Sequence, residues 1–304
     1  MAHCVVSKAE AILDKEFPVL DKGFVRLVDY LGGDERVVQA ARVSYGAGTR
    51  NYREDAGLID YLLRHHHTSP FEQVVLTFHV KLPIFVARQW IRHRTARVNE
   101  LSGRYSVMKD DFYLPEAGDV ALQSDDNKQG RREEALEAGE AEKVRSAFEQ
   151  GQRESYKNYL GLVDRGIARE LARINLPLSL YTEWYWQIDL HNLFHFLKLR
   201  LDSHAQKEIR LYARVIFDIA RNVAPRCCES FERHILEAVS FSQDEFAELK
   251  RRLAARSAKP DNSNTTDDNA DPALSGKPPL SGKTPLSGKS LERFEVKLNT
   301  GKQL

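Results

Sequence analysis

The sequence predicts an α+β fold: a mixed α/β domain whose central sheet is flanked by helices, followed by a disordered C-terminal tail. Three observations lead to this prediction. Hydrophobic residues alternate with period two over residues 74–82 and 180–188, which is typical of strands with one buried face. Hydrophobic residues recur with helical spacing in most segments around those strands. After Lys259 the hydrophobic residues give way to polar residues and to a repeated unit of Pro, Leu, Ser, Gly and Lys.

The first half of the chain alternates between predicted strands and helices. The expected elements are, in order, a strand over residues 24–31, a helix from Asp34 through Ala41, a helix over residues 58–63, the strand over residues 74–82 and a helix from Pro83 through Trp90. Asp34 is a residue type that caps helix N-termini. Pro83 stops a strand ladder and suits the first turn of a helix.

The second half begins with an acidic, Gly-containing stretch, residues 115–143, which predicts an exposed insertion. The elements expected after it are a long helix with Val144, Phe148, Tyr156, Tyr159 and Leu160 inward, a break at Pro177, the strand over residues 180–188, a helix over residues 190–197, a helix from Ser203 to Pro225 and a last helix from Ser242 to Ser257. Ser203 and Gln206 match a capping box.

Composition limits the class of protein. The 304 residues are 42% hydrophobic and 29% charged, with a formal net charge of +1. These values are ordinary for a globular protein and leave no global field that would attract nucleic acid. No hydrophobic run approaches the length of a membrane span, and residues 1–20 do not resemble a secretory signal. Three cysteines form no disulfide framework, so we expect a cytoplasmic protein.

We expect one folded domain over residues 1–258 and a disordered tail over residues 259–304. The tail repeats a unit that contains a single leucine, and one leucine cannot offset the cost of ordering the backbone around it.

Residues 92–105, with the sequence RHRTARVNELSGRY, are the most informative segment. They place four arginines, one carboxylate, a carboxamide and a Ser-Gly step close together. Arginine grips phosphate with a planar fork, and Ser102 and Gly103 let backbone N–H groups approach an anion. Glu100 could orient a ribose hydroxyl. A solvated basic face is the alternative, but it does not require Asn, Ser, Gly and Tyr at these positions. The segment therefore predicts a nucleotide-binding site.

This segment resembles the signature of the flavin-dependent thymidylate synthases, RHRxxSxNExSxRY. Every fixed position matches except the first Ser, where this chain has Arg97. The resemblance extends to residues 67–72, 85–90 and 199–206 and spans roughly residues 20 to 240. The tail has no counterpart in that pattern.

The resemblance implies the thymidylate synthase fold of that family over residues 1–258 and a specific reaction. That reaction is the reductive methylation of dUMP to dTMP, with methylenetetrahydrofolate as carbon donor and NADPH-reduced FAD as hydride source, and without a Cys nucleophile. It also implies a homotetramer whose active sites are shared between subunits, with no nucleic acid or membrane partner.

The resemblance assigns the substrate dUMP to Gln89, Trp90, Ile91, Arg92, Glu100, Leu101, Ser102, Gly103, Arg104, Arg173 and Arg200. It makes Arg200 the catalytic residue, because a fixed guanidinium stabilises negative charge that develops on the uracil ring. From its sequence position alone, Arg200 would be a helix C-terminal arginine that complements the helix dipole.

The resemblance assigns FAD to His67, Ser69, Arg92, His93, Arg94, Glu100, Asp189, Leu190, His191 and His195. Two arginines and a histidine suit a pyrophosphate. The family usually has Asn, Arg and Asn where this chain has Asp189, His191 and His195, so we expect different contacts at these positions.

Other functions remain open at this point. His191 and His195 are four residues apart, which is metal-ligand spacing, so a metal-dependent hydrolase is one alternative. No Glu adjoins the first of these histidines to act as a base. A second alternative is a nucleotide-binding module without catalysis. A third possibility is a thiol mechanism through Cys227 or Cys228, although buried cysteines at a helix start are most often small hydrophobic residues.

Overall fold

The structure is a computed structural model that describes residues 4–43, 52–125, 127–257 and 288–300. The chain divides into two compact units, Met1–Phe231 and Glu232–Leu304. The boundary that we predicted, after residue 258, lies further along the chain than this division. The helix expected from Ser242 to Ser257, at the end of the predicted first domain, therefore belongs to the second unit.

The first unit carries the sheet. Its helices and strands are α1 (Ser7–Glu10), β1 (Glu16–Val19), β2 (Gly23–Leu31), α2 (Asp34–Arg42), α3 (Tyr52–Arg64), η2 (Phe71–Gln73), β3 (Val75–Pro83), α4 (Ile84–Trp90), β4 (Arg97–Glu100), η3 (Ala117–Asp119), β5 (Ala121–Gln123), β6 (Arg131–Ala135), α5 (Ala138–Asp164), α6 (Arg169–Ala172), η4 (Arg173–Asn175), β7 (Tyr181–Asp189), α7 (Leu190–Arg200), α8 (Lys207–Val223) and α9 (Pro225–Phe231).

The main sheet of the described residues is antiparallel throughout, with the strand order β1-β2-β3-β7-β4. The two strands with the clearest period-two pattern, β3 and β7, are neighbours at its centre, and Phe78 pairs with Trp186. Alternate residues of both strands are fully buried. The predicted strands over residues 24–31, 74–82 and 180–188 are therefore confirmed, as is the α+β class.

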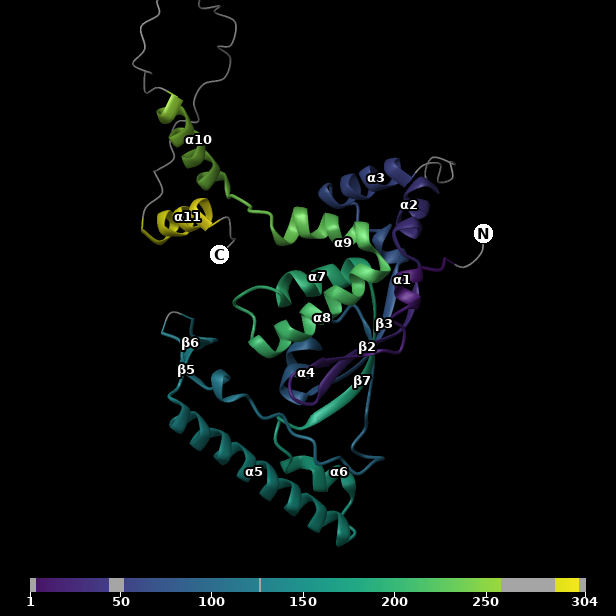
Figure 1. Cartoon of the computed structure of the whole chain (residues 1–304), viewed down its shortest axis with the longest axis vertical. Coiled ribbons are helices and arrows are strands. Elements are labelled where there is room, and N and C mark those ends of the chain that lie inside the picture. The colour runs from purple at the N-terminus through teal and green to yellow at the C-terminus, as the bar shows by residue number, and fades with distance from the viewer. Residues whose placement is uncertain (1–3, 44–51, 126, 258–287, 301–304) are drawn as a thin grey trace, which may run out of the picture. The chain divides into compact units, whose positions relative to one another are not determined.

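Helices α4, α7 and α8 lie beside the sheet (Figure 1). The aromatic core between them centres on Trp90, whose ring lies 5.6 Å from Trp184, 5.1 Å from Trp186 and 4.9 Å from Phe196. All four rings are almost completely excluded from solvent. Because large aromatic rings dominate core energetics, this cluster fixes the end of α4 against β7 and α7.

Two predicted helix caps are wrong. Asp34 does not cap α2; its carboxylate accepts the backbone N–H groups of Arg226 and Cys227 at 2.9 and 3.0 Å and so caps α9 instead. Ser203 and Gln206 form no capping box: α8 begins at Lys207, and no side chain caps it. The sequence shows which residues can cap a helix, but not which helix start the fold brings to them.

The predicted exposed insertion, residues 115–143, contains a small hairpin of β5 and β6 that leads into α5. Ion pairs join this segment to α8. Arg131 of β6 pairs with Glu208 at 3.1 Å, and Asp119 of η3 pairs with Lys207. Of the residues expected inside α5, Tyr159 is buried, but Phe148 is 50% exposed. Phe148 faces a cavity rather than the core.

The second unit contains α10 (Gln243–Ser257) and α11 (Gly288–Thr300). Ser242 and Glu245 exchange hydrogen bonds between side chain and backbone, so the predicted start of α10 is confirmed. The predicted disordered tail is wrong over residues 288–300, where α11 forms. Phe294 is fully buried there, and Glu295 and Lys297 pair with Arg252 and Glu245 of α10. The expectation for residues 259–287 and 301–304 lies outside the described residues.

Candidate active site

Helix α4 delivers the start of the arginine-rich segment. Trp90 anchors its last turn in the aromatic core, so the Trp90 side chain is a core residue and does not reach the surface. Ile91 and Arg92 follow at the surface, and Gln89 is partly exposed. The Gln89 side chain donates a hydrogen bond to Gln206, which immediately precedes α8. Sequence reasoning did not predict this Gln89–Gln206 contact, although Gln206 lies in a stretch that resembles the family.

Arg200, at the end of α7, meets the residues that follow α4. Its Nε donates a hydrogen bond of 3.0 Å to Nε2 of His93. The His93 ring also lies 5.8 Å from His195 and 5.0 Å from Phe196. The structure thus brings together four predicted site residues, Arg92, His93, His195 and Arg200, which we call the α7 group.

Electrostatics in the α7 group favour a neutral histidine beside a cation. Burial, followed by the charges of Arg200 and His195, lowers the pKa of His93 from 6.5 to about 4. Burial and the charge of Arg92 lower the pKa of the Arg200 guanidinium, which remains cationic at neutral pH. Neutral His93 can accept the hydrogen from Arg200 and hold the guanidinium in place.

Strand β4 continues the segment along the edge of the sheet. It pairs with β7 from Arg97 opposite Gln187 to Glu100 opposite Trp184. The Glu100 carboxylate accepts a 2.7 Å hydrogen bond from the hydroxyl of Thr182, which fixes its position. Arg97 is exposed and donates a weak 3.4 Å hydrogen bond to Gln187. Arg97 therefore occupies an edge position that tolerates a long, charged side chain.

After β4 the chain turns at Ser102, Gly103 and Arg104. Gly103 is buried, and a Cβ atom built on it would lie 2.8 Å from the sulfur of Met108 and 3.1 Å from Cδ of Arg173. Only glycine fits this close approach without displacing a neighbour. The structure therefore brings Arg173 against the Ser-Gly turn.

Arg104, in the same turn, points to α6, where its Nε lies 3.2 Å from a carboxylate oxygen of Glu170. Both side chains are more than half exposed, so the pair contributes little stability. Glu170 was not a predicted site residue. We call Ser102, Gly103, Arg104 and Arg173 the turn group.

The N-terminus of α7 contains further predicted residues. Asp189 caps the helix: its two carboxylate oxygens accept the backbone and side-chain N–H groups of Asn192 at 2.9 and 2.7 Å. Leu190 is fully buried, whereas His191 is partly exposed. Thr95 of the arginine-rich segment donates a hydrogen bond to Asn192. Segment 92–105 thus passes directly over the start of α7.

The predicted residues do not converge at one point within a single chain. The α7 group and the turn group lie at opposite ends of β4, whose four residues span roughly 13 Å. His67 and Ser69, in the segment before η2, are exposed, and neither contacts either group within the described part of the chain. The exposed Leu101 follows β4 and donates its backbone N–H to Glu183.

The alternatives find little support in the described part of the chain. Cys227 and Cys228 are fully buried, and burial together with Asp34 raises the pKa of Cys227 well above 9.0, so this thiol is not activated. No three His, Cys, Asp or Glu side chains among the described residues are grouped as metal ligands, so His191 and His195 have no third partner there. No described helix is both long and hydrophobic enough to cross a membrane.

The fold and the two groups define a class: an α+β protein with an antiparallel sheet and an arginine-rich segment along its edge. Two family models match the chain. The one described as thymidylate synthase complementing protein covers residues 26–226, and the one described as thymidylate synthase ThyX C-terminal domain covers residues 239–304. The chain therefore belongs to the flavin-dependent thymidylate synthase family. The second match also corrects the expectation that the tail has no counterpart in the family.

Similar proteins agree. The flavin-dependent thymidylate synthase of Treponema denticola is 59% identical over 96% of this chain and 100% of its own length. That of Thermus thermophilus is 57% identical over 78% of this chain and 85% of its own. A solved structure of the UMP/dUMP methylase PolB from Streptomyces cacaoi, bound with 5-Br dUMP, is 33% identical with a TM-score of 0.66, covering 72% of this chain and 98% of PolB.

Proposed function

We propose that this chain methylates dUMP to dTMP, taking the carbon from methylenetetrahydrofolate and using NADPH to reduce a bound FAD, in the cytoplasm. The pairing of Arg200 with a neutral His93 carries this proposal. Before the uracil ring can attack the methylene carbon it must become electron-rich, and negative charge develops on the pyrimidine as its N3 side is polarised or deprotonated. A guanidinium that is already oriented stabilises this charge without reorganising during the reaction. His93 orients Arg200 through its Nε, which leaves the two terminal nitrogens of the guanidinium for the ring.

The turn group would hold the phosphate of dUMP. Gly103 lets Arg173 pack closely against the turn, and Arg104 and Arg173 both supply cationic forks there. Arg173 is exposed and pairs with no carboxylate of the described residues, so its charge is available. Glu100, held by Thr182, is placed to accept a hydrogen bond from a sugar hydroxyl.

The α7 group and its neighbours fit FAD by their donor chemistry. Arg92 and Arg94 are exposed, and neither has an ion-pair partner among the described residues, so both can meet a pyrophosphate. His93 is neutral and half-buried, which suits contact with a flat ring system. The reduced flavin would supply the hydride that completes the methyl group. Asp189 is already engaged as a helix cap, so we expect His191 and His195 to make the closer contacts.

Separation of the two groups along β4 supports a site shared between copies of the chain. If each dUMP is bound by the α7 group of one protomer and the turn group of another, neither protomer is complete alone. We therefore propose a homotetramer, a closed symmetric assembly in which such reciprocal contacts complete every site.

Complementation tests the shared site. Arg200→Ala and Arg173→Ala proteins should each be nearly inactive, but refolding or co-expressing them together should restore up to about a quarter of the wild-type activity, because random mixing joins the two intact groups in that share of sites. A matched control mixes Arg200→Ala with Arg92→Ala, both in the α7 group, and should restore nothing. Absence of recovery in the first mixture would refute sharing.

A direct assay tests the reaction. The purified protein should be yellow, its flavin absorption should bleach anaerobically with NADPH and dUMP, and dTMP should form only when dUMP, methylenetetrahydrofolate and NADPH are all present. A colourless protein that binds dUMP would instead be a nucleotide-binding module. Bleaching without dTMP in the complete mixture would exclude the synthase reaction.

A further inference from the structure

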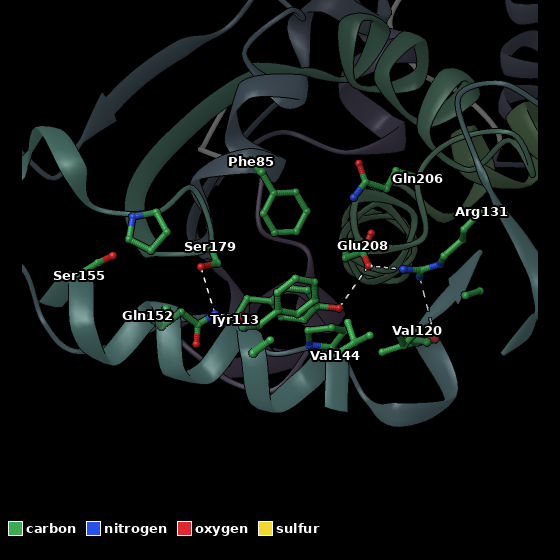
Figure 2. A pocket seen from close by; sticks show the side chains of 17 residues that line it. Phe85, Tyr113, Val120, Arg131, Val144, Gln152, Ser155, Ser179, Gln206 and Glu208 are labelled. Carbon is green, nitrogen blue, oxygen red and sulfur yellow. Dashed lines mark hydrogen bonds and ion pairs between the residues drawn. The ribbon is translucent and has the colours of Figure 1, made fainter. Parts of the chain in front are cut away.

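A cavity of about 690 Å³ lies apart from both groups of site residues, within the first unit. Helix α5 forms one wall with Val144, Ala147 and Phe148, and Phe85 and Tyr113 form others (Figure 2). None of the predicted substrate or cofactor residues lines it. Its volume is within the range of small-molecule sites in proteins, and its walls are mostly apolar and aromatic.

Glu208 gives the cavity a specific polar feature. Its side chain is only 3% exposed. One carboxylate oxygen, Oε1, accepts hydrogen bonds from Tyr113 at 3.2 Å and Arg131 at 3.1 Å, as the dashed lines in Figure 2 show. The other, Oε2, is buried and has no donor among the described residues. A buried acceptor that lacks a donor is unfavourable, so a ligand that donates a hydrogen bond to Oε2, once a neighbouring side chain has moved to admit the donor, gains affinity.

Charge balance around Glu208 selects a neutral ligand. Its negative charge is paired with Arg131, and Asp119 is paired with Lys207 at the same end of the cavity. A cationic ligand would add an uncompensated charge, and an anionic one would face the carboxylate. The ligand that fits is therefore neutral, flat and aromatic, with one N–H donor.

The cavity is linked to the substrate-binding residues through Gln206. This side chain lines the cavity and accepts the hydrogen bond from Gln89, which resembles a dUMP-binding residue. A ligand in the cavity that contacts Gln206 competes with or reinforces that bond. Occupancy of the cavity would thus change the orientation of Gln89.

We propose that this cavity is a regulatory site for a neutral aromatic molecule with an N–H donor, held by Glu208 Oε2 and coupled to dUMP binding through Gln206 and Gln89. The coupling rests on the proposed function, whereas the binding site does not.

Indole and 1-methylindole are a matched pair of probes, because only indole has the N–H group. Titration of the full-length protein, followed by saturation-transfer NMR, should give an indole Kd on the order of 1 mM, as expected for a ligand of this size. 1-Methylindole should bind about tenfold more weakly. Equal affinity for the two probes overturns the assignment of Glu208.

Three variants locate the binding. Ala147→Trp fills the cavity from α5 and should abolish indole binding, while Ser146→Trp, the exposed neighbouring residue that does not line the cavity, should leave it unchanged. Glu208→Gln can keep a carbonyl oxygen toward Arg131 and Tyr113 but turns an amide donor to the cavity, so the preference for indole over 1-methylindole should disappear. Indole binding that survives Ala147→Trp overturns the site.

Calorimetry tests the coupling without an activity assay. Saturating dUMP should change the indole Kd at least about twofold, and indole should change the dUMP Kd by the same factor, since coupling is reciprocal. Gln206→Ala should remove this effect but not indole binding. An indole Kd that ignores bound dUMP overturns the coupling. A protein that binds indole but not dUMP would count against the proposed function and leave the binding site standing.

Discussion

Arg200 is the residue at which the proposed chemistry can be tested most directly. Removing its guanidinium deletes an interaction that strengthens as charge develops on the pyrimidine, so Arg200→Ala should lower kcat by about 10²–10³-fold. The dUMP Kd, measured by calorimetry, should rise less than about tenfold. Arg200→Lys keeps the charge but loses the planar fork that His93 holds, and should recover little turnover. Equal losses in binding and turnover would remove Arg200 from the catalytic role.

His93 makes the stability of the protein depend on pH. Its folded-state pKa of about 4 lies below its ordinary value of 6.5, so between these values the unfolded chain binds more protons. The stabilisation from neutral His93 is therefore complete above about pH 6.5 and is lost as the pH falls toward 4. After allowance for its partial exposure, this amounts to about 1–2 kcal/mol.

Urea unfolding of wild-type protein and a His93→Gln variant at pH 7.5 and pH 5 isolates this contribution. Gln cannot titrate, yet its side-chain carbonyl can still accept from Arg200. The difference in free energy of unfolding between the wild type and the variant should shrink or reverse at pH 5. An identical pH dependence in both would mean that another group causes the acid sensitivity.

Arg97 is where the chain departs from the family signature, and its environment predicts a mild consequence. The side chain is exposed on edge strand β4 and makes one weak hydrogen bond to Gln187. Arg97→Ser should therefore change kcat/KM by less than about threefold, since surface changes of this kind rarely exceed about 0.5 kcal/mol. A gain of orders of magnitude in steady-state assays would show that Arg97 impairs the natural chain.

Helix α9 depends on a cap from a distant part of the sequence. The Asp34 carboxylate receives the first N–H groups of α9, 192 residues away from Arg226. Asp34→Ala should lower the free energy of unfolding by about 1–2 kcal/mol, in the range for loss of a helix cap. Glu35→Ala, in the same turn of α2 with the same charge, should cost less than about 0.5 kcal/mol. Equal effects in denaturant titrations would indicate a charge effect instead.

Sequence patterns predicted elements whose signals are local, and failed where the partner is distant. The alternation in β3 and β7 follows from burial of one face, which the residues themselves specify. Ser242 and Glu245 cap each other within one turn, so that capping box was predictable. Ser203 has the same spacing to Gln206, but Gln206 instead bonds to Gln89 of α4. Tertiary contacts outweighed the local preference there.

The candidate site shows the same limit. The arginine-rich segment and Arg200 were predictable because their pattern resembles a family signature. The pairing of Arg104 with Glu170 and of Glu100 with Thr182 was not, since each joins residues more than 60 apart in the chain. The motif therefore predicted the site residues. The contacts that orient them depend on how the fold packs β4, α6 and β7 against one another.

At the scale of the whole molecule, the chain consists of two units with separate cores. In the second unit, Phe294 is fully buried beside ion pairs of Glu295 with Arg252 and Lys297 with Glu245. A single buried aromatic residue thus carries much of the packing between α10 and α11. Phe294→Ala should cost about 3–5 kcal/mol of local stability, enough to unfold a unit of this size.

Hydrogen exchange followed by mass spectrometry measures the local stability of each unit separately. In the Phe294→Ala protein, the amides of α10 and α11 should lose protection, while those of β3 and β7 should exchange as in the wild type, because local cooperative units open independently. Leu298→Ala is the control on the same helix, since Leu298 is already 37% exposed and should change little. Equal loss of protection in β3 and β7 would show instead that the two units unfold as one, and that α11 belongs to the cooperative core of the enzyme.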